Sequence, residues 1–236
     1  MNDIGQRLVN EANFLWEDRA YHFPKLLTNP SEFLTWGDVE YCANNPAFYE
    51  FEMIDHENNK VNIDRHVRSW VYDKTVQDAR QLVSHINHGH TFIIMNYGFH
   101  SRETQELLKT FESIFAIDCA IHVYGGKEGS KSFNIHDDYP SNFIIQVEGE
   151  TEWKIYKNRI SSMLQTGFLQ DQIREENLEV DLHVTLQPGD ALYIPSRAYH
   201  CAFPTGERLS MSIPCWTRMP NSTQTSDRNY YPIYHA

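Results

Sequence analysis

The sequence predicts a mainly β protein, a barrel or double-sheet jelly roll with a helical N-terminal portion packed on it. Short β-branched and aromatic segments follow one another from residue 119 onward, separated by turn-forming residues. Amphipathic helical patterns are concentrated before that point. The chain of 236 residues is 41% hydrophobic and 22% charged, which is typical of a folded protein with a sizeable core.

The first ninety residues are expected to be rich in helix. Helical spacing of apolar residues predicts helices over 4–14 and 76–86, with a proline-punctuated loop at 24–30. The run at 91–95 predicts the first buried strand, and 104–115 predicts a helix with one apolar face. The N-terminal portion is therefore taken as 1–90.

The remainder of the chain reads as a series of strands. Turn residues separate the expected strands, which are 120–124, 132–136, 143–147, 152–156, 184–186, 191–194 and 209–213. A polar, partly helical insertion is expected over 161–181. We expect one jelly roll over 91–220 and a polar tail over 221–236.

The charge balance restricts the partners. Lysine and arginine number 20 against 32 aspartates and glutamates, a net charge of −12, which argues against nucleic acid or an anionic membrane surface as partner. A basic peptide or small basic substrate remains compatible with this charge. The four cysteines form no C-x-x-C pair, and no secretory signal or 18-residue apolar run is visible, so a cytoplasmic protein is expected.

Three side chains suggest metal chemistry. His136 and Asp138 follow a predicted strand, and residues i and i+2 of an extended chain face the same side. His200 follows another predicted strand 64 residues later. Two imidazoles and one carboxylate can occupy one face of an octahedral Fe(II) ion and leave three positions open for a co-substrate and dioxygen. An H-x-D tripeptide alone is more often a solvated pair, so the surrounding sequence decides.

That surrounding sequence carries two motifs. The stretch QPGDALYIPSRAYH at 187–200 resembles the second cupin motif, with Arg197 standing where the motif has glycine. The stretch NIHDDYPSNFIIQVEGETEW at 134–153 is similar to the H-x-D…N-x-F-x-x-Q-x-x-G-x-x-x-W segment of JmjC-type, cupin-like 2-oxoglutarate oxygenases, particularly the ribosomal oxygenases. The resemblance covers roughly 91–216 and implies a double-stranded β-helix.

The resemblance also implies roles for single residues. His136, Asp138 and His200 match the iron ligands, while Asn142 and Tyr124 match polar residues that contact 2-oxoglutarate. One position departs from the family, because Thr151 stands where a lysine or arginine usually binds the distal carboxylate of 2-oxoglutarate. A buried dicarboxylate needs a cation, and Arg208 with Ser210 resembles the R-x-S element that supplies one in other 2-oxoglutarate oxygenases. The alternative for Arg208 is a surface arginine, and for Tyr124 a core tyrosine.

The resemblance therefore implies a dioxygenase that uses Fe(II), 2-oxoglutarate and O₂ to hydroxylate a C–H bond, on a protein or peptide side chain. A free amino acid or small metabolite is an alternative substrate. A metal-binding cupin without 2-oxoglutarate chemistry is an alternative of a different class, and the absence of a cation at Thr151 keeps it open. A homodimer is possible from the sequence.

Overall fold

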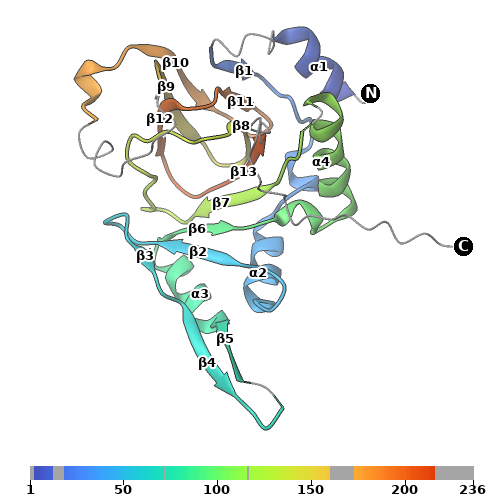
Figure 1. The fold of residues 1–236 in the computed structure, drawn as a ribbon, viewed down its shortest axis with the longest axis vertical. Coiled ribbons are helices and arrows are strands. Elements are labelled where there is room, and N and C mark those ends of the chain that lie inside the picture. The colour runs from blue at the N-terminus through green and yellow to red at the C-terminus, as the bar shows by residue number, and fades with distance from the viewer. Residues whose placement is uncertain (1–2, 13–18, 72, 116, 160–172, 216–236) are drawn as a thin grey trace, which may run out of the picture.

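The computed structural model describes residues 3–12, 19–71, 73–115, 117–159 and 173–215. An eight-stranded sheet in the order β1-β11-β8-β13-β7-β6-β2-β3 faces a three-stranded sheet in the order β10-β9-β12. Within the described residues every strand pair is antiparallel. Figure 1 shows the two sheets wrapped into a barrel. The mainly β expectation is confirmed.

The elements have the following bounds. The helices are α1 (Asp3–Glu11), η1 (Pro30–Glu32), α2 (Trp36–Asn44), α3 (Ala79–Asn87), η2 (Tyr97–Phe99), α4 (Arg102–Phe115) and η4 (Glu175–Asn177). The strands of the N-terminal part are β1 (Tyr21–Phe23), β2 (Phe51–Ile54), β3 (Lys60–Val61), β4 (Asp64–Arg68), β5 (Asp73–Gln77) and β6 (Thr91–Ile94). The later strands are β7 (His122–Gly126), β8 (Ser141–Glu148), β9 (Thr151–Arg159), β10 (Val180–Leu186), β11 (Ala191–Ile194), β12 (Ala198–Pro204) and β13 (Arg208–Cys215).

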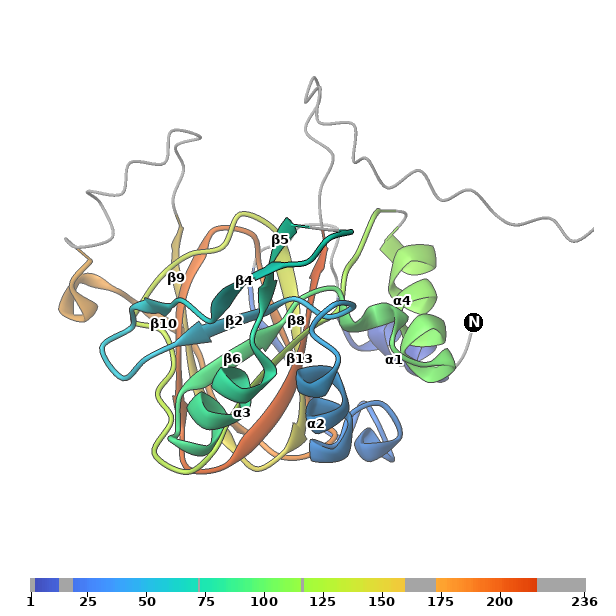
Figure 2. The ribbon, with the colours of Figure 1, turned by 90° about the horizontal axis from the view of Figure 1, so that it is seen from below.

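The apolar core divides between the two faces of the large sheet. Ile144, Ile155, Leu192 and Ile194 belong to a small cluster formed by residues of both sheets. A larger cluster lies on the other face and includes the buried sides of the helices. Figure 2 shows α1, α2 and α4 on one side of the barrel and the β9–β10 pair on the other. The helices therefore cover the outer face of the large sheet, while its inner face meets the three-stranded sheet.

The N-terminal residues contribute strands as well as helices to this barrel. β1 pairs with β11 and β2 pairs with β6, so segments before residue 90 lie in the same sheet as β8 and β13. The sequence pattern did not indicate these strands because they are only three or four residues long. The boundary at residue 90 stays a prediction. Most of the expected insertion at 161–181, and the tail, lie outside the described residues.

Two strand assignments differ from expectation. Residues 132–136 do not form a strand, since His136 alone makes an isolated bridge there. β12 was not predicted, because its sequence AYHCAFP combines small residues with a polar histidine and lacks a β-branched run. β12 pairs with β9 over Ala198 to Pro204, with a register irregularity between Ala198 and His200.

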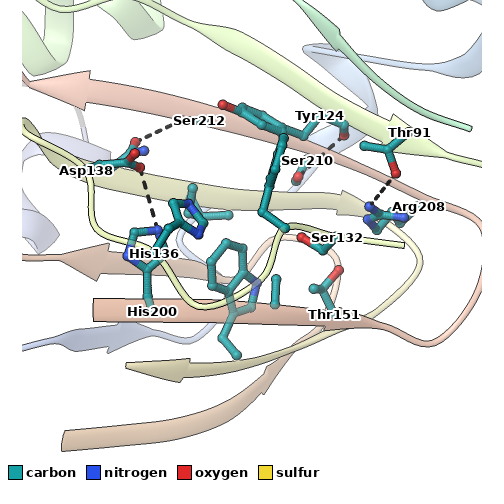
Figure 3. A pocket seen from close by; sticks show the side chains of 15 residues that line it. Thr91, Tyr124, Ser132, His136, Asp138, Thr151, His200, Arg208, Ser210 and Ser212 are labelled. Atoms are coloured by element: carbon teal, nitrogen blue, oxygen red, sulfur yellow. Dashed lines mark hydrogen bonds and ion pairs between the residues drawn. The ribbon is translucent and has the colours of Figure 1, made fainter. Parts of the chain in front are cut away.

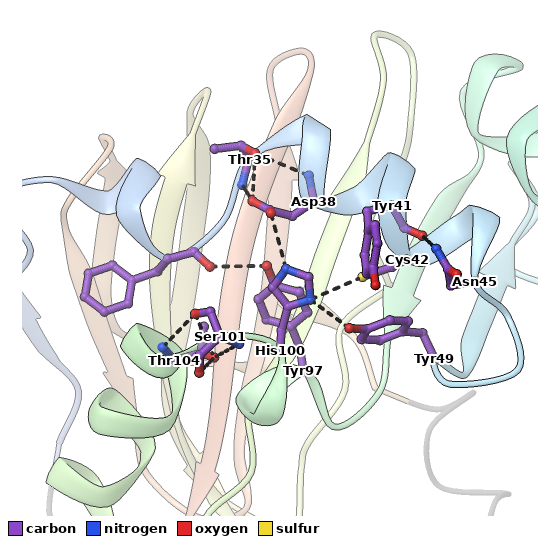
Figure 4. A network of polar contacts seen from close by, with 11 residues as sticks. Thr35, Asp38, Tyr41, Cys42, Asn45, Tyr49, Tyr97, His100, Ser101 and Thr104 are labelled. Atoms are coloured by element: carbon purple, nitrogen blue, oxygen red, sulfur yellow. Dashed lines mark hydrogen bonds and ion pairs between the residues drawn. The ribbon is translucent and has the colours of Figure 1, made fainter.

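A polar network fastens α2 to the η2 segment (Figure 4). Asp38 completes a capping box with Thr35, and its carboxylate lies 3.2 Å from Nε2 of His100. The hydroxyl of Tyr49 lies 3.0 Å from Nδ1 of His100, and Sγ of Cys42 lies 3.8 Å from it. Burial raises the pKa of the Cys42 thiol to about 12, and the residue is fully buried, so this Cys-His-Asp grouping is a structural tie and not a nucleophile.

The β4–β5 hairpin forms a separate two-stranded sheet that projects from the barrel (Figure 1). Trp70 at its tip is 96% exposed, the most exposed large hydrophobic side chain of the described residues. No helix in the described part of the chain is both long enough and apolar enough to cross a membrane.

Candidate metal and 2-oxoglutarate site

The predicted metal triad assembles at one end of the barrel. His136 and His200 form an antiparallel bridge in which each backbone N–H donates to the other's carbonyl, at 3.1 and 2.9 Å. This pairing places the two imidazoles side by side, with ring centres 4.3 Å apart. Asp138 brings its carboxylate to 3.6 Å from Nε2 of His200. The ligand atoms of the three residues all lie within 4.8 Å of one another, so they can bind one ion.

Backbone hydrogen bonds fix which nitrogen each imidazole presents. Nδ1 of His136 lies 2.7 Å from the carbonyl oxygen of Asn134, and Nδ1 of His200 lies 2.9 Å from that of Ala198. Each ring therefore donates from Nδ1 and keeps the lone pair of Nε2 for a metal. A hydrogen bond of this kind orients a metal-binding histidine and sets its tautomer.

The protonation states also suit a metal. Burial, followed by the neighbouring His200, lowers the pKa of His136 to about 4, so its imidazole is neutral at pH 7. Burial acts to raise the pKa of Asp138, but the two histidines and a hydrogen bond from Asn142 outweigh it and lower that pKa. An ionised carboxylate at Asp138 and a neutral imidazole at His136 are the forms in which these side chains bind a divalent ion.

An ion pair holds the two ligand-bearing segments together. Nε of Arg197 lies 2.8 Å from Oδ2 of Asp137, and the side chains are 11% and 1% exposed. The backbone N–H of Arg197 also donates to the carbonyl of Asp138 at 2.8 Å. Burial raises the pKa of Asp137, and the Arg197 charge opposes this shift. Arg197 has φ +62°, the left-handed conformation that explains the glycine of the cupin motif at this position.

A pocket of about 210 Å³ extends from the triad into the barrel. Its far end holds Arg208, Thr91, Thr151, Ser132 and Ser210, as Figure 3 shows. Arg208 is 4% exposed, so it is not the surface arginine that the sequence left open. Burial lowers its pKa to about 10, which leaves it charged at pH 7.

Within the described segments, the guanidinium of Arg208 has neutral partners only. It donates to Oγ of Ser130, to the Lys131 carbonyl at 3.2 Å and to Oγ1 of Thr91 at 3.4 Å. Among the described residues no carboxylate forms an ion pair with it. A buried cation with no anionic partner is costly, so this end of the pocket is built to receive an anion.

Other buried polar atoms at the pocket are unsatisfied. Oγ1 of Thr151 and Nε1 of Trp153 have no hydrogen-bond partner among the described residues, and both side chains line the pocket. Thr151 is 2% exposed, so its hydroxyl can meet a partner only inside the pocket. Unsatisfied donors beside an unpaired guanidinium are consistent with a ligand rich in oxygen atoms.

The structure brings all eight predicted site residues to this pocket. His136, Asp138, His200, Asn142, Tyr124, Thr151, Arg208 and Ser210 all line it. Ser212 donates to Oδ1 of Asn142 at 2.9 Å, which turns the amide of Asn142 toward Asp138. The ring of Tyr124 crosses the pocket with its hydroxyl toward the Ser212 side (Figure 3), so it is not a core tyrosine. Burial raises its pKa.

Sequence reasoning missed the residues that support Arg208. Thr91 begins a strand, Ser130 and Lys131 lie in an irregular loop, and the pairing of β6 with β7 and of β7 with β13 brings them to Arg208. Lys154 does not line the pocket, and its ammonium group pairs with Glu175 at 2.9 Å. Side chains alternate along β9, so Lys154 faces away from Thr151 and Trp153, which line the pocket.

Comparisons with known proteins agree with the motifs. The family model described as JmjC domain matches residues 94–225, more than half of the chain. The bifunctional lysine-specific demethylase and histidyl-hydroxylase NO66 of Dictyostelium discoideum is 28% identical over 139 residues, 58% of this chain and 27% of that protein. Ribosomal oxygenase 1 of Danio rerio is 28% identical over 120 residues, 48% of this chain and 21% of that protein.

Solved structures show the same fold. YcfD, a ribosomal oxygenase from Escherichia coli in complex with cobalt and succinic acid, superposes with a TM-score of 0.62 at 15% identity, covering 89% of this chain and 52% of YcfD. The YcfD complex with cobalt and 2-oxoglutarate gives a TM-score of 0.59 at 16% identity over the same shares. The chain thus spans about half the length of YcfD and about a quarter of the curated relatives. Fold and family model agree, and the chain belongs to the JmjC domain family.

Proposed function

We propose that this chain is an Fe(II)- and 2-oxoglutarate-dependent oxygenase that hydroxylates a C–H bond of a protein or peptide side chain. The observation that carries the proposal is the buried, unpaired guanidinium of Arg208 in the same pocket as the triad. A dicarboxylate co-substrate has one carboxylate for the metal and one for this cation. Its five-carbon chain matches a pocket that extends inward from the triad.

Each residue then has a defined task. His136, Asp138 and His200 hold the metal, with the tautomers set by their Nδ1 hydrogen bonds. Arg208 binds the distal carboxylate with Thr151 and Ser210 beside it, and Tyr124 and Asn142 line the pocket between the two ends. Bound iron, dioxygen and 2-oxoglutarate together supply the oxidation, in which 2-oxoglutarate becomes succinate and carbon dioxide and the substrate gains one oxygen atom.

A protein substrate is favoured over a small metabolite. The relatives carry names that describe lysine demethylation, histidine hydroxylation and action on the ribosome, all on proteins. The net charge of −12 suits a basic peptide segment. A free amino acid remains the second candidate, and a cytoplasmic location and a homodimer stay predictions.

The decisive experiment measures 2-oxoglutarate binding and succinate formation in Arg208→Met. This variant keeps the length and loses the charge, so we expect at least a hundredfold weaker 2-oxoglutarate binding with Mn(II) affinity unchanged. Adding Thr151→Arg moves the cation to the position that the family uses and should restore part of the affinity. Wild-type 2-oxoglutarate affinity in Arg208→Met would refute the assignment.

A second measurement distinguishes the proposed oxygenase from the alternative function, a metal-binding cupin that does not use 2-oxoglutarate. A ligand that binds only the folded protein raises its melting temperature, so 2-oxoglutarate should raise the melting temperature of the Mn(II)-loaded wild type. The metal-site variant Asp138→Ala should lose both this rise and succinate formation. A wild type that shows no rise at millimolar 2-oxoglutarate would instead favour the cupin without co-substrate.

A further inference from the structure

A second group of histidines lies outside the pocket, where α3 ends. The sequence HINHGH at 85–90 turns the chain from α3 into β6, and the loop between β2 and β3 brings His56 against this turn. Nδ1 of His85 lies 3.0 Å from Nδ1 of His90, with the rings stacked 4.8 Å apart. The ring of His56 meets His90 edge to face at 5.2 Å. His90 therefore contacts both of the other imidazoles, and all three rings are half-buried.

We infer that His85, His90 and His56 form a second metal site, which takes Zn²⁺ or a similar late first-row divalent ion. Zinc binds imidazole nitrogen at about 2.0–2.1 Å, which in a tetrahedron separates two ligand nitrogens by about 3.3 Å and two ring centres by roughly 5 Å. The nitrogen separation of 3.0 Å and the ring separations of 4.8 and 5.2 Å are close to these values. The site closes when the ring of His56 rotates to present a nitrogen.

The donor set selects the ion. Three imidazoles without a thiolate suit zinc, copper(II) or nickel, whereas calcium and magnesium require oxygen ligands. Burial and then the neighbouring histidines lower the pKa of His90, so this imidazole has the neutral form that a metal binds. This donor set differs from the triad of His136, Asp138 and His200, which includes a carboxylate.

The histidine site lies next to the loop that contacts Arg208. The Lys131 side chain donates to the backbone carbonyl of His56 at 3.0 Å, and the Lys131 carbonyl accepts from Arg208. Gly89, at φ +77°, brings the turn so close that a Cβ there would lie 3.1 Å from the Glu128 carbonyl. A zinc ion would join the α3–β6 turn to the β2–β3 loop, next to the segment that holds Arg208.

The test isolates this site from the triad. Protein without a histidine tag, carrying His136→Ala and His200→Ala, is titrated with Zn²⁺ against a chromophoric chelator. We expect one bound equivalent, and two in the wild type, with a higher melting temperature when zinc is bound. In this background His85→Ala or His90→Gln should weaken zinc binding at least tenfold, and His56→Ala should weaken it measurably.

His88 supplies the matched control. It belongs to the same histidine tract but is exposed, and its Nδ1 lies 2.6 Å from the Ser84 carbonyl. His88→Ala should keep the zinc affinity. Cobalt(II) should give the intense visible absorption of a four-coordinate site, and His90→Gln should abolish it. The inference is overturned if the variant without the triad histidines binds no zinc, or if its zinc affinity is the same with and without His85 and His90.

Discussion

The ion pair between Asp137 and Arg197 offers a quantitative test of how the metal ligands are held. Replacing Arg197 by methionine removes the charge that lies 2.8 Å from a carboxylate only 1% exposed. Breaking a buried ion pair from one side costs about 3–5 kcal/mol, because the remaining charge stays buried without a partner. We therefore expect Arg197→Met to lower the free energy of unfolding by that amount.

The Arg197→Gly variant distinguishes the effect of losing the ion pair from the effect of the left-handed backbone conformation. Glycine loses the same charge but adopts φ +62° without steric strain, which is worth roughly 1–2 kcal/mol. Arg197→Gly should thus be more stable than Arg197→Met by about that difference. The double variant with Asp137→Asn should be less destabilised than the two single changes added together, because the partners lose the same interaction.

Urea unfolding of the metal-free protein measures all of these values, and Mn(II) titration measures the effect on the site. Because the pair joins the segments of His136 and His200, we expect weaker Mn(II) binding in Arg197→Met. A free-energy change below about 1 kcal/mol would refute the ion-pair argument, given the usual cost of breaking a buried pair. A glycine variant less stable than the methionine variant would refute the backbone argument.

Two further predictions concern pH and a turn. Burial lowers the pKa of His136 from 6.5 to about 4, so its contribution to stability is complete above pH 6.5 and is lost as the pH falls toward 4. The loss should reach about 3 kcal/mol in the metal-free protein, measured by urea unfolding across this range, and a profile unchanged in His136→Gln would contradict it. Gly149→Ala should lower the melting temperature more than Gly129→Ala, since both glycines have positive φ but only the first would place a Cβ 2.0 Å from a backbone oxygen, that of Glu207. Equal melting temperatures of the two variants would contradict this prediction and show that the backbone at residue 149 shifts to accommodate the Cβ.

The sequence predicted the parts of the fold that depend on local pattern. The apolar runs of β8 and β11 and the apolar face of α4 were sufficient to place these elements. The β4–β5 hairpin was not predicted, because its strands are polar and mostly exposed. Trp70 at the tip of this hairpin is 96% exposed, so it lies outside the apolar core.

The sequence predicted those residues of the candidate site that lie in recognisable motifs. The H-x-D triplet and His200 lie in motifs of the family, and Arg208 followed from the chemical need for a cation once Thr151 was seen to lack one. Thr91 and Ser130 could not be predicted as partners of Arg208, because they lie 117 and 78 residues away from it along the chain. Such contacts depend on strand order, which local patterns do not specify.

Because the backbones of His136 and His200 are paired, metal affinity depends on the register in which these two segments align. The two imidazoles are neighbours because their own peptide groups are paired, so a shift of the β12 segment by one residue would turn His200 to the opposite face. Metal binding should therefore appear late in refolding, after segments 64 residues apart in the sequence have aligned. A rapid-mixing experiment with Co(II) absorption would then report when the barrel closes.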